Sequence, residues 1–551
     1  MKKIIPLSCC IFTFSLSYSQ WNSNSALNTP VCVTTKNQQN LNVVTDGKGG
    51  AIVAWEDSRN SVLTQRDIYV QRLDKNGIAK WTANGVLVCN NDSDQAAIGL
   101  AADGKGGAIL VWGDTRNGKK DIYAQKVDSI GAVQWTANGI VVCTKAGTQS
   151  APKIVSDGSG GGIVVWEDSL TANPDIYAQR ISSVGATMWA SGGVGVCTNV
   201  SAQNNPRITT DSVGGAIIVW QDFRNGNDYD IYAQRINPSG TAQWTTQGVM
   251  VCNAVGTQNN PKIKPDGSSG AIIVWVDKRG IAHDIYAQRL NASGAVQWAA
   301  NGVVICNAVG SQSALAITTS GISGAIIAWK DLRSGTYEDI YAQKISLTGT
   351  VGWTANGIAI ATGALTQKNV SIAGDGNGGA ILVWQDSAAT GIDIYAQKVD
   401  GSGAKVWTAA GVTVATASAD QTYPDNVADA NGGCIFAWQD GRNTLDNDIY
   451  AHHLYSNGTT TSAVIESVTF FESTPFPNPI SSSATIQINA PGINKVVFSV
   501  CDMLGEKVKI PFSISQNEIV VSKGGLPNGI YFYEIRTDNN GISKGKLILV
   551  D

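Results

Sequence analysis

Short apolar runs alternate with polar, glycine-rich turns from residue 20 to residue 455. One unit contains the run AIIVW at residues 216–220, then a polar loop, then DIYAQRI at residues 230–236. These runs are rich in β-branched residues and show no sustained 3.6-residue period, which favours strands over helices. Asp-Gly and Gly-Gly pairs between the runs supply the positive φ angles that tight hairpin turns need. We expect four short antiparallel strands in each unit and almost no helix after the leader.

Three anchors show that this unit occurs eight times, with a spacing of mostly 54 or 55 residues. The first anchor is a Trp at the end of an apolar run, found at Trp55, Trp112, Trp166, Trp220, Trp275, Trp329, Trp384 and Trp438. The second is the triplet Asp-Ile-Tyr, which begins at Asp67, Asp121, Asp175, Asp230, Asp284, Asp339, Asp393 and Asp448. The third is a second Trp, found at Trp81, Trp135, Trp189, Trp244, Trp298, Trp353 and Trp407. A period of this size is typical of a repeat architecture.

Four antiparallel strands in a unit of this length are typical of a propeller blade. The eighth unit has no second Trp, and the missing part stands at the other end of the chain, where Trp21 precedes Val31 and Cys32. We therefore predict an all-β fold in which residues 20–455 form an eight-bladed β-propeller and an N-terminal strand closes the last blade. Such closure leaves no open sheet edge.

Six cysteines occupy one equivalent position in successive units, where the last two units have Ala361 and Ala415. Equivalent positions on stacked sheets lie about 10 Å apart, whereas a disulfide needs Cα atoms within about 7 Å of each other. We expect buried free thiols, and the same distance argues against a metal site, so no metal and no cofactor is predicted. The six are Cys32, Cys89, Cys143, Cys197, Cys252 and Cys306.

Charge and the N-terminal segment limit the possible partners. The net charge is −4, and no run of basic residues is present that would track phosphates, so nucleic acid is not an expected partner. Residues 1–19 combine Lys2 and Lys3, an apolar run and a small-residue end, which is typical of a signal peptide cleaved between Ser19 and Gln20. No apolar span of 18 residues follows, so the mature chain is predicted to lack a transmembrane helix. We expect a secreted monomer.

The repeat ends after Leu454. Residues 456–473 are rich in Ser and Thr and are predicted to form a linker. Residues 474–551 show turn residues and alternating apolar positions, which predict a small Ig-like β-sandwich. Four motifs follow one another there: PNP at residues 477–479, DMLGEKV at 502–508, LPNGIYFY at 526–533 and GKLIL at 545–549.

Taken together and in this order, these motifs resemble the C-terminal sorting domain (type A) of the type IX secretion system. The resemblance implies that the signal peptide leads the chain to the periplasm and that residues 474–551 are recognised by the secretion machinery at the outer membrane. It also implies that a surface peptidase removes the tail. We therefore expect a protein that is secreted, or held at the outer cell surface, of a Gram-negative bacterium.

Six units carry an Asp two residues after the first Trp and an Arg two residues further on. In one interpretation each Asp closes its own turn and pairs with its Arg, because short polar side chains bond to nearby groups in turns. A recurrent Gln at Gln38, Gln95 and their equivalents is likewise predicted to bond backbone groups between blades. In the other interpretation the Asp/Arg loops share one face and form a polar ring that binds a ligand such as a glycan or a protein. The candidate ligand-binding residues are Asp57, Arg59, Asp114, Arg116, Asp222, Arg224, Asp277, Arg279, Asp331, Arg333, Asp440 and Arg442.

An enzymatic interpretation has little support in the sequence. A catalytic group should break the repeat, whereas the Asp, Arg and Tyr residues recur in blade after blade. Of the three His, His283 lies in a loop of ordinary length, and His452 and His453 are expected at the rim. No zinc-protease, nucleophile-elbow or phosphate-loop motif occurs. No loop between the first Trp and the Asp-Ile-Tyr triplet is long enough, by itself, to build a pocket.

We therefore predict no catalytic residue and a non-enzymatic binding or adhesion module at the cell surface. A glycan-active hydrolase or lyase that uses the Asp/Arg face is the alternative function. A purely structural surface protein is the third.

Overall fold

The computed structural model describes residues 21–61, 65–170, 173–321, 324–388, 391–443, 445–460, 469–471, 473–488, 496–503, 505–515, 518–537 and 541–551. The predicted leader, with its cleavage site between Ser19 and Gln20, lies outside these residues. The chain divides into two compact units, Met1–Thr461 and Ser462–Asp551. Within the described ranges there is no α-helix, and hence none that could span a bilayer.

The first unit contains eight four-stranded antiparallel sheets, here named blades 1 to 8. Blade 1 is formed by β2 (Gln38–Thr45), β3 (Ala51–Asp57), β4 (Asp67–Leu73) and β5 (Val86–Cys89). Blade 2 is formed by β6 (Gln95–Ala102), β7 (Ala108–Asp114), β8 (Asp121–Val127) and β9 (Ile140–Cys143). Blade 3 is formed by β10 (Gln149–Ser156), β11 (Gly162–Asp168), β12 (Asp175–Ile181) and β13 (Val194–Cys197). Blade 4 is formed by β14 (Gln203–Thr210), β15 (Ala216–Asp222), β16 (Asp230–Ile236) and β17 (Val249–Cys252).

The same order continues in the second half of the ring. Blade 5 is formed by β18 (Gln258–Pro265), β19 (Ala271–Asp277), β20 (Asp284–Leu290) and β21 (Val303–Cys306). Blade 6 is formed by β22 (Gln312–Thr319), β23 (Gly324–Asp331), β24 (Asp339–Ser346) and β25 (Ile358–Ala361). Blade 7 is formed by β26 (Gln367–Gly374), β27 (Ala380–Ala388), β28 (Gly391–Val399) and β29 (Val412–Ala415). Blade 8 is formed by β30 (Gln421–Ala428), β31 (Cys434–Asp440), β32 (Asp448–Leu454) and the N-terminal strand β1 (Thr29–Cys32).

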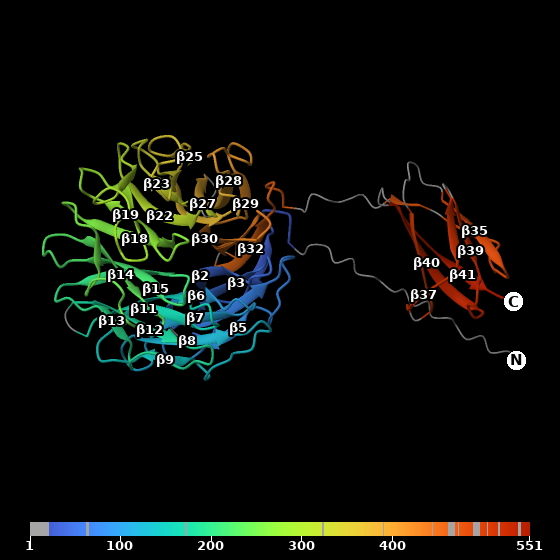
Figure 1. Ribbon diagram of the computed structural model, residues 1–551, viewed down its shortest axis with the longest axis horizontal. Coiled ribbons are helices and arrows are strands. Elements are labelled where there is room, and N and C mark those ends of the chain that lie inside the picture. The colour runs from blue at the N-terminus through green and yellow to red at the C-terminus, as the bar shows by residue number, and fades with distance from the viewer. Residues whose placement is uncertain are drawn as a thin grey trace. The chain divides into compact units, whose positions relative to one another are not determined.

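The first strands of the eight blades form a closed inner ring. Each of them contacts the first strand of the next blade, and β30 contacts β2. Figure 1 shows β2, β6, β22 and β30 near the centre of the ring and β5, β9, β13, β25 and β29 near its rim. The contact between blades 8 and 1 completes the circle, so the predicted eight-bladed β-propeller is confirmed.

The N-terminal strand completes the last blade, as predicted. β1 pairs antiparallel with β32, and Trp21 takes the place that the second Trp has in the other blades. The Trp21 indole Nε1 donates a hydrogen bond to the Lys75 carbonyl of blade 1 at 2.9 Å. Its ring lies so close to Gly77 that a Cβ there would be 2.7 Å from the indole. Trp21 therefore joins the two ends of the ring.

Each hydrophobic core of the propeller lies between two adjacent blades. Trp298 and Cys306 of blade 5, for example, pack against Ile327 and Trp329 of blade 6. Burial of each large apolar side chain contributes roughly 1.5–3 kcal/mol. The six predicted thiols are free and buried, and burial raises the pKa of Cys89 to about 11. The expected free, buried thiols are confirmed, and five of them also accept a contact from a nearby Arg Nη2 at 2.9–3.5 Å.

The expected rim positions of His452 and His453 are wrong, because both side chains are buried. His453 Nε2 lies 2.8 Å from the Asp429 carboxylate, and its ring stacks on Trp21 with the ring centres 5.7 Å apart. His452 occupies the position that holds a buried Gln in the other blades. The fold buries the His452 position in every blade, and in blade 8 the closing segment with Trp21 provides the cover.

Acid should destabilise the propeller through His452. Burial, helped by the charge of His453, lowers the pKa of His452 from 6.5 to about 4. The unfolded chain therefore takes up the proton first, so the stabilisation is complete above pH 6.5 and is lost as the pH falls towards 4. At about pH 5 the loss in free energy of unfolding is about 2 kcal/mol. Urea unfolding of the wild type and of His452→Gln across this range should give the shallower pH slope for the variant, and equal slopes would contradict the assignment.

The second unit is a sandwich of two sheets with the orders β33-β41-β40-β36-β37 and β34-β35-β39-β38. The apolar faces of both sheets meet in one core that includes Ile486, Phe498 and Tyr533. β33 pairs in parallel with β41, so this unit begins ahead of residue 474, while residues 461–468 of the predicted linker lie outside the described residues. The strands are β33 (Thr469–Phe470), β34 (Pro475–Phe476), β35 (Ser483–Gln487), β36 (Val496–Cys501), β37 (Lys507–Val508), β38 (Phe512–Ser515), β39 (Glu518–Ser522), β40 (Gly529–Thr537) and β41 (Gly541–Leu549).

Candidate ligand-binding face of the propeller

The loops that carry the candidate Asp and Arg residues open on one face of the ring. In each blade the recurrent Gln at the start of the first strand lies opposite the candidate Asp at the end of the second strand. In blade 4 these are Gln203 and Asp222, and Asp222 in turn lies opposite Asp230 of the Asp-Ile-Tyr triplet. The glycine-rich turns stand at the other end of the same strands. We call the face with the Asp/Arg loops the loop face.

On the loop face, each Asp–Arg pair is bonded within its own blade. Asp222 is fully buried, and its Oδ2 accepts hydrogen bonds from Trp220 Nε1 at 2.8 Å and from Arg224 Nη2 at 2.6 Å. Its Oδ1 accepts from Arg224 Nε at 2.8 Å. The guanidinium lies over the Tyr232 ring, with Cζ 3.7 Å from the ring centre, which is favourable for a cation–π contact. The guanidinium also donates to the Gln247 carbonyl. We call this set of contacts around one Asp–Arg pair the staple, and it joins three parts of one blade.

Five other blades repeat the staple. Their Arg Nη2 to Asp Oδ2 distances are 2.5–2.7 Å, the Asp side chains are fully buried and the Arg side chains are 13–25% exposed. Burial acts to raise the pKa of Asp114, but hydrogen bonds from Arg116 and Trp112 outweigh it and lower that pKa. These contacts are the ones that the turn-closing interpretation expects. Ligand binding stays a prediction for Asp57, Arg59, Asp114, Arg116, Asp222, Arg224, Asp277, Arg279, Asp331, Arg333, Asp440 and Arg442.

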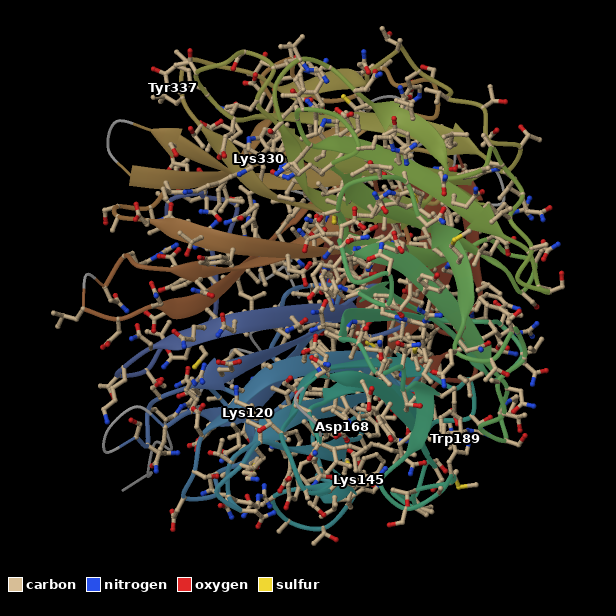
Figure 2. The ribbon with its side chains drawn as sticks, turned by 90° about the vertical axis from the view of Figure 1, so that its left-hand side faces the viewer. Lys120, Lys145, Asp168, Trp189, Lys330 and Tyr337 are labelled. Atoms are coloured by element: carbon tan, nitrogen blue, oxygen red, sulfur yellow. The ribbon has the colours of Figure 1, made fainter. Side chains whose placement is uncertain are left out.

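Blades 3 and 7 lack the Arg of the staple. In blade 3, Leu170 stands in its place, and Lys145 reaches over the Tyr177 ring at 4.2 Å from the segment after β9. Within the described ranges, both oxygens of the Asp168 carboxylate and the Trp166 indole nitrogen are buried without a hydrogen-bond partner. Figure 2 shows Lys145 and Asp168 in the same part of the ring. Asp168 is therefore a natural example of this carboxylate without its staple.

A second set of contacts links neighbouring blades around the axis. Glu56 Oε1, directly after the first Trp, accepts a hydrogen bond from the Ala97 backbone N–H of the next blade at 2.8 Å. Glu167 does the same with Asn205 at 2.7 Å. The recurrent Gln side chains are almost fully buried, and their Nε2 atoms donate to carbonyls of the preceding connection, as Gln95 does. The prediction that these Gln bond backbone groups between blades is confirmed.

A hollow of about 490 Å³ opens where the inner strands of blades 8, 1 and 2 reach the loop face. Its lining includes Glu56, Arg66, Lys120 and Tyr423. A second hollow of about 560 Å³ shares Arg66 with the first and includes Asp94. Although no long loop was predicted, a hollow forms because three blades build it together. We call the first hollow the mouth.

Arg66 holds the carboxylates of the mouth in place. Its Nη1 donates to Glu56 Oε2 at 2.7 Å, and its Nε and Nη2 donate to the two oxygens of Asp94 at 2.8 and 2.5 Å. Glu56 Oε2 also accepts from Asn40 Nδ2 at 2.9 Å. Bidentate pairs of this kind are strong and fix geometry, and the hydrogen bonds to Asp94 raise the pKa of Arg66. Arg66 therefore sets the shape of the mouth.

Tyr423 is an exposed aromatic side chain at the mouth. It is 60% exposed, and its φ angle is 51°, in the left-handed region that a bulky residue adopts at a cost of order 1 kcal/mol. The equivalent positions in the other blades are Asn or Ala, such as Asn40 and Ala97. Its backbone N–H is held by Gln385 Oε1 at 3.1 Å. The fold thus holds an aromatic ring at the mouth near the exposed Lys120, which Figure 2 labels.

Arg66, Lys120 and Tyr423 are not among the site residues predicted from the sequence. A signal was nevertheless present, because the position before the Asp-Ile-Tyr triplet holds a different residue in every blade. Tyr423 likewise replaces the usual Asn or Ala. The rule that a functional residue should break the repeat finds all three, provided that it is applied to every position of the unit.

Residues 474–550 match the family model described as the secretion system C-terminal sorting domain. A comparison with curated proteins gives no match. Among solved structures, the chain is similar to a eukaryotic initiation factor (TM-score 0.42, 10% identity, 79% of this chain and 90% of that chain). It is also similar to the polysaccharide lyase Uly1 (0.41, 10%, 71% and 92%) and to the endo-arabinase from Bacteroides thetaiotaomicron (0.27, 14%, 47% and 95%). Since every TM-score is below 0.5, these likenesses say nothing about activity.

The family match, the ordered motifs of residues 477–549 and the two-sheet sandwich agree with one another. The resemblance predicted from the sequence is therefore confirmed for the C-terminal unit. This unit is a type IX secretion system C-terminal sorting domain, and the protein is exported to the cell surface or the extracellular space.

Proposed function

We propose that the propeller is the non-catalytic binding module of this exported protein and that it holds a polar ligand, a glycan or a protein, at the mouth. The observation that carries the proposal is the open hollow of about 490 Å³ with an exposed Tyr423 and Lys120 at its lining. Binding sites are typically concave and combine aromatic side chains with a few polar groups that orient the ligand. Tyr423 offers a flat apolar face, and Lys120 offers a donor to hydroxyl or carboxylate groups.

The bonding of the carboxylates at the mouth supports binding more than hydrolysis. Glycoside hydrolysis uses two carboxyl groups that flank the scissile bond, one of them as a proton donor. Glu56 and Asp94 are both ion-paired with Arg66, at 2.7 and 2.5 Å. Both carboxylates are thus bound to one guanidinium, whereas a hydrolase would have them flank the bond to be cleaved.

This function is tested with the chain lacking residues 1–19. The chain is screened for binding to glycans and proteins, and a reducing-sugar assay is run beside the screen. We expect binding without turnover, and about a tenfold loss of affinity in Tyr423→Ala. Tyr423→Asn restores the residue common at this position, so it should fold at least as stably and still lose affinity. Tyr337→Ala, at an exposed tyrosine of blade 6 labelled in Figure 2, is the matched control. Turnover would make the protein an enzyme, and the absence of any ligand would favour a structural role.

A further inference from the structure

The inner strands of blades 3, 4 and 5 place cations at one level of the propeller axis. Lys153, Arg207 and Lys262 occupy equivalent register positions opposite the second strands of their blades. Lys264 lies two residues further along β18, and since side chains alternate along a strand it shares the face of Lys262. Because these first strands form the inner ring, the four cations belong to the wall of the central channel.

The charges of these side chains converge. Lys153 and Lys262 stand on blades that are not adjacent, yet the pKa of Lys262 is lowered to about 8 by burial and then by the charges of Arg207, Lys153 and Lys264. Burial and the charge of Arg207 likewise lower the pKa of Lys153 to about 8. Cations on separate blades influence one another in this way when they extend into one shared space. The four side chains therefore face the channel together.

The ammonium groups of this wall lack partners. Among the described residues, none of the three lysines has an ion pair or a hydrogen bond. Arg207 donates to the neighbouring Pro206 carbonyl at 2.8 Å. Uncompensated cations at close quarters repel one another, so the wall is a source of electrostatic strain as it stands.

Two carboxylates face the cluster and do not neutralise it. Glu167 accepts hydrogen bonds from Ser150 and from the Asn205 backbone. Asp425, across the ring in blade 8, accepts from Ser371 Oγ at 2.9 Å and from the Val43 N–H at 3.1 Å, and burial raises its pKa. Four cations therefore share the channel with two acids. Burial raises the pKa of one of these acids, Asp425, and so favours its neutral form.

The rest of this level carries one acid and otherwise uncharged residues. Blade 8 has Asp425 at the equivalent register position, and the four remaining blades have Asn42, Gly99, Ala316 and Ser371 there. Solvent reaches the wall, since Lys153, Arg207 and Lys262 are partly exposed and Lys264 is exposed. The level is thus accessible as well as positively charged.

We propose that Lys153, Arg207, Lys262 and Lys264 form an oxyanion site in the propeller channel, which takes sulfate or phosphate either as a free ion or as the substituent of a polysaccharide. A tetrahedral oxyanion presents several oxygens, so it can accept charge-assisted hydrogen bonds from several cations at once. The bound anion supplies negative charge that the protein lacks there and offsets the repulsion within the wall. The site lies on blades 3 to 5 and is separate from the mouth on blades 8, 1 and 2.

Calorimetric titration of the chain lacking residues 1–19 with sodium sulfate and with sodium phosphate tests the site. Saturable binding at about pH 7 is expected, and Lys262→Met and Lys264→Met should each weaken it about tenfold or more. Lys105→Met, at an exposed lysine of the turn between β6 and β7, should leave the affinity unchanged. Sulfate affinity should also fall between about pH 7 and pH 9, because the lysines lose their protons there while sulfate does not titrate.

A second measurement separates the site from a structural role. Without anion, Lys262→Met should raise the melting temperature, because it removes an uncompensated cation from the channel. To separate the two sources of the oxyanion, a sulfated polysaccharide is compared with its desulfated form. If only the free ion binds, the site takes a small ion. If the sulfated polysaccharide binds, the desulfated form does not, and the binding is lost in Lys262→Met, the site takes the sulfate substituent of a polysaccharide. Tyr423→Ala should retain sulfate binding. The test of the oxyanion site therefore remains valid even if no ligand binds at the mouth.

Two results would overturn the proposal. One is the absence of saturable binding to sulfate, phosphate and the sulfated polysaccharide. The other is an unchanged sulfate affinity in both Lys262→Met and Lys264→Met, whether or not the melting temperature changes.

Discussion

Replacing Trp21 by Ala is expected to lower the free energy of unfolding of the propeller by about 4 kcal/mol. The indole is 4% exposed, so the substitution removes a large buried apolar surface. It also removes the hydrogen bond to Lys75 and the stack on His453. These contacts hold the N-terminal segment against blades 8 and 1. The midpoint of urea unfolding, followed by tryptophan fluorescence, measures the loss.

Trp81→Ala, at the junction of blades 1 and 2, is the matched control for Trp21→Ala. Trp81 occupies the equivalent position of blade 1, is 7% exposed and donates to the Ser129 carbonyl of the next blade at 3.2 Å. We expect a similar loss of free energy but a different pattern of local opening. Hydrogen exchange of the β32 amides should accelerate selectively in Trp21→Ala. Trp21 holds the segment that leads into β1 against blades 8 and 1, and β1 is the strand that pairs with β32. Equal exchange of β32 in the two variants would show that Trp21 does not hold the ring closed.

The closure was predictable because every blade needs the same four parts. The eighth unit lacks its last part, and the N-terminus carries a Trp and a Val-Cys pair at the required place. The burial of His452 and His453 was harder to predict, because polar residues recur at both positions. The Gln equivalent to His452 is nevertheless buried in every other blade, since it bonds the backbone around the second Trp, as Gln71 does with Thr82 and Trp81. A polar side chain that recurs in every blade can therefore be part of the interior, and its polarity alone does not reveal this.

The two charged features of the propeller show a second limit. Recurrence identifies the Asp and Arg residues, but whether they face solvent or a Trp indole depends on the loop geometry, and here the carboxylates turn inward. The basic wall is hidden from the linear sequence, because Lys153, Arg207 and Lys262 stand 54 and 55 residues apart in a chain of net charge −4. The ring brings equivalent positions of successive units to one level. A local cluster can therefore exist without any basic run in the sequence.

Asp222→Asn is expected to lower the free energy of unfolding by about 2–3 kcal/mol, whereas Asp168→Asn should leave it unchanged or raise it. Asp222 accepts hydrogen bonds from Trp220 and from Nε and Nη2 of Arg224, so the substitution leaves a half-buried guanidinium without its counter-ion. Asp168 has no such partner among the described residues. Its substitution removes the desolvation penalty of an unpaired, buried carboxylate. Urea unfolding of both variants at neutral pH measures the difference.

The double variant Asp222→Asn/Arg224→Leu decides how much of this loss belongs to the staple. Leu is the residue that blade 3 carries at this position, as Leu170, so a natural blade already accommodates Leu there. If the single loss arises from the stranded guanidinium, removing that group should recover about half of it, since the free energies of bonded partners are not additive. A double variant that is no more stable than the single one would place the loss in the bond to Trp220. In that case the Arg residues, 13–25% exposed in the six staples, would be the part of the loop face that is free to contact a ligand.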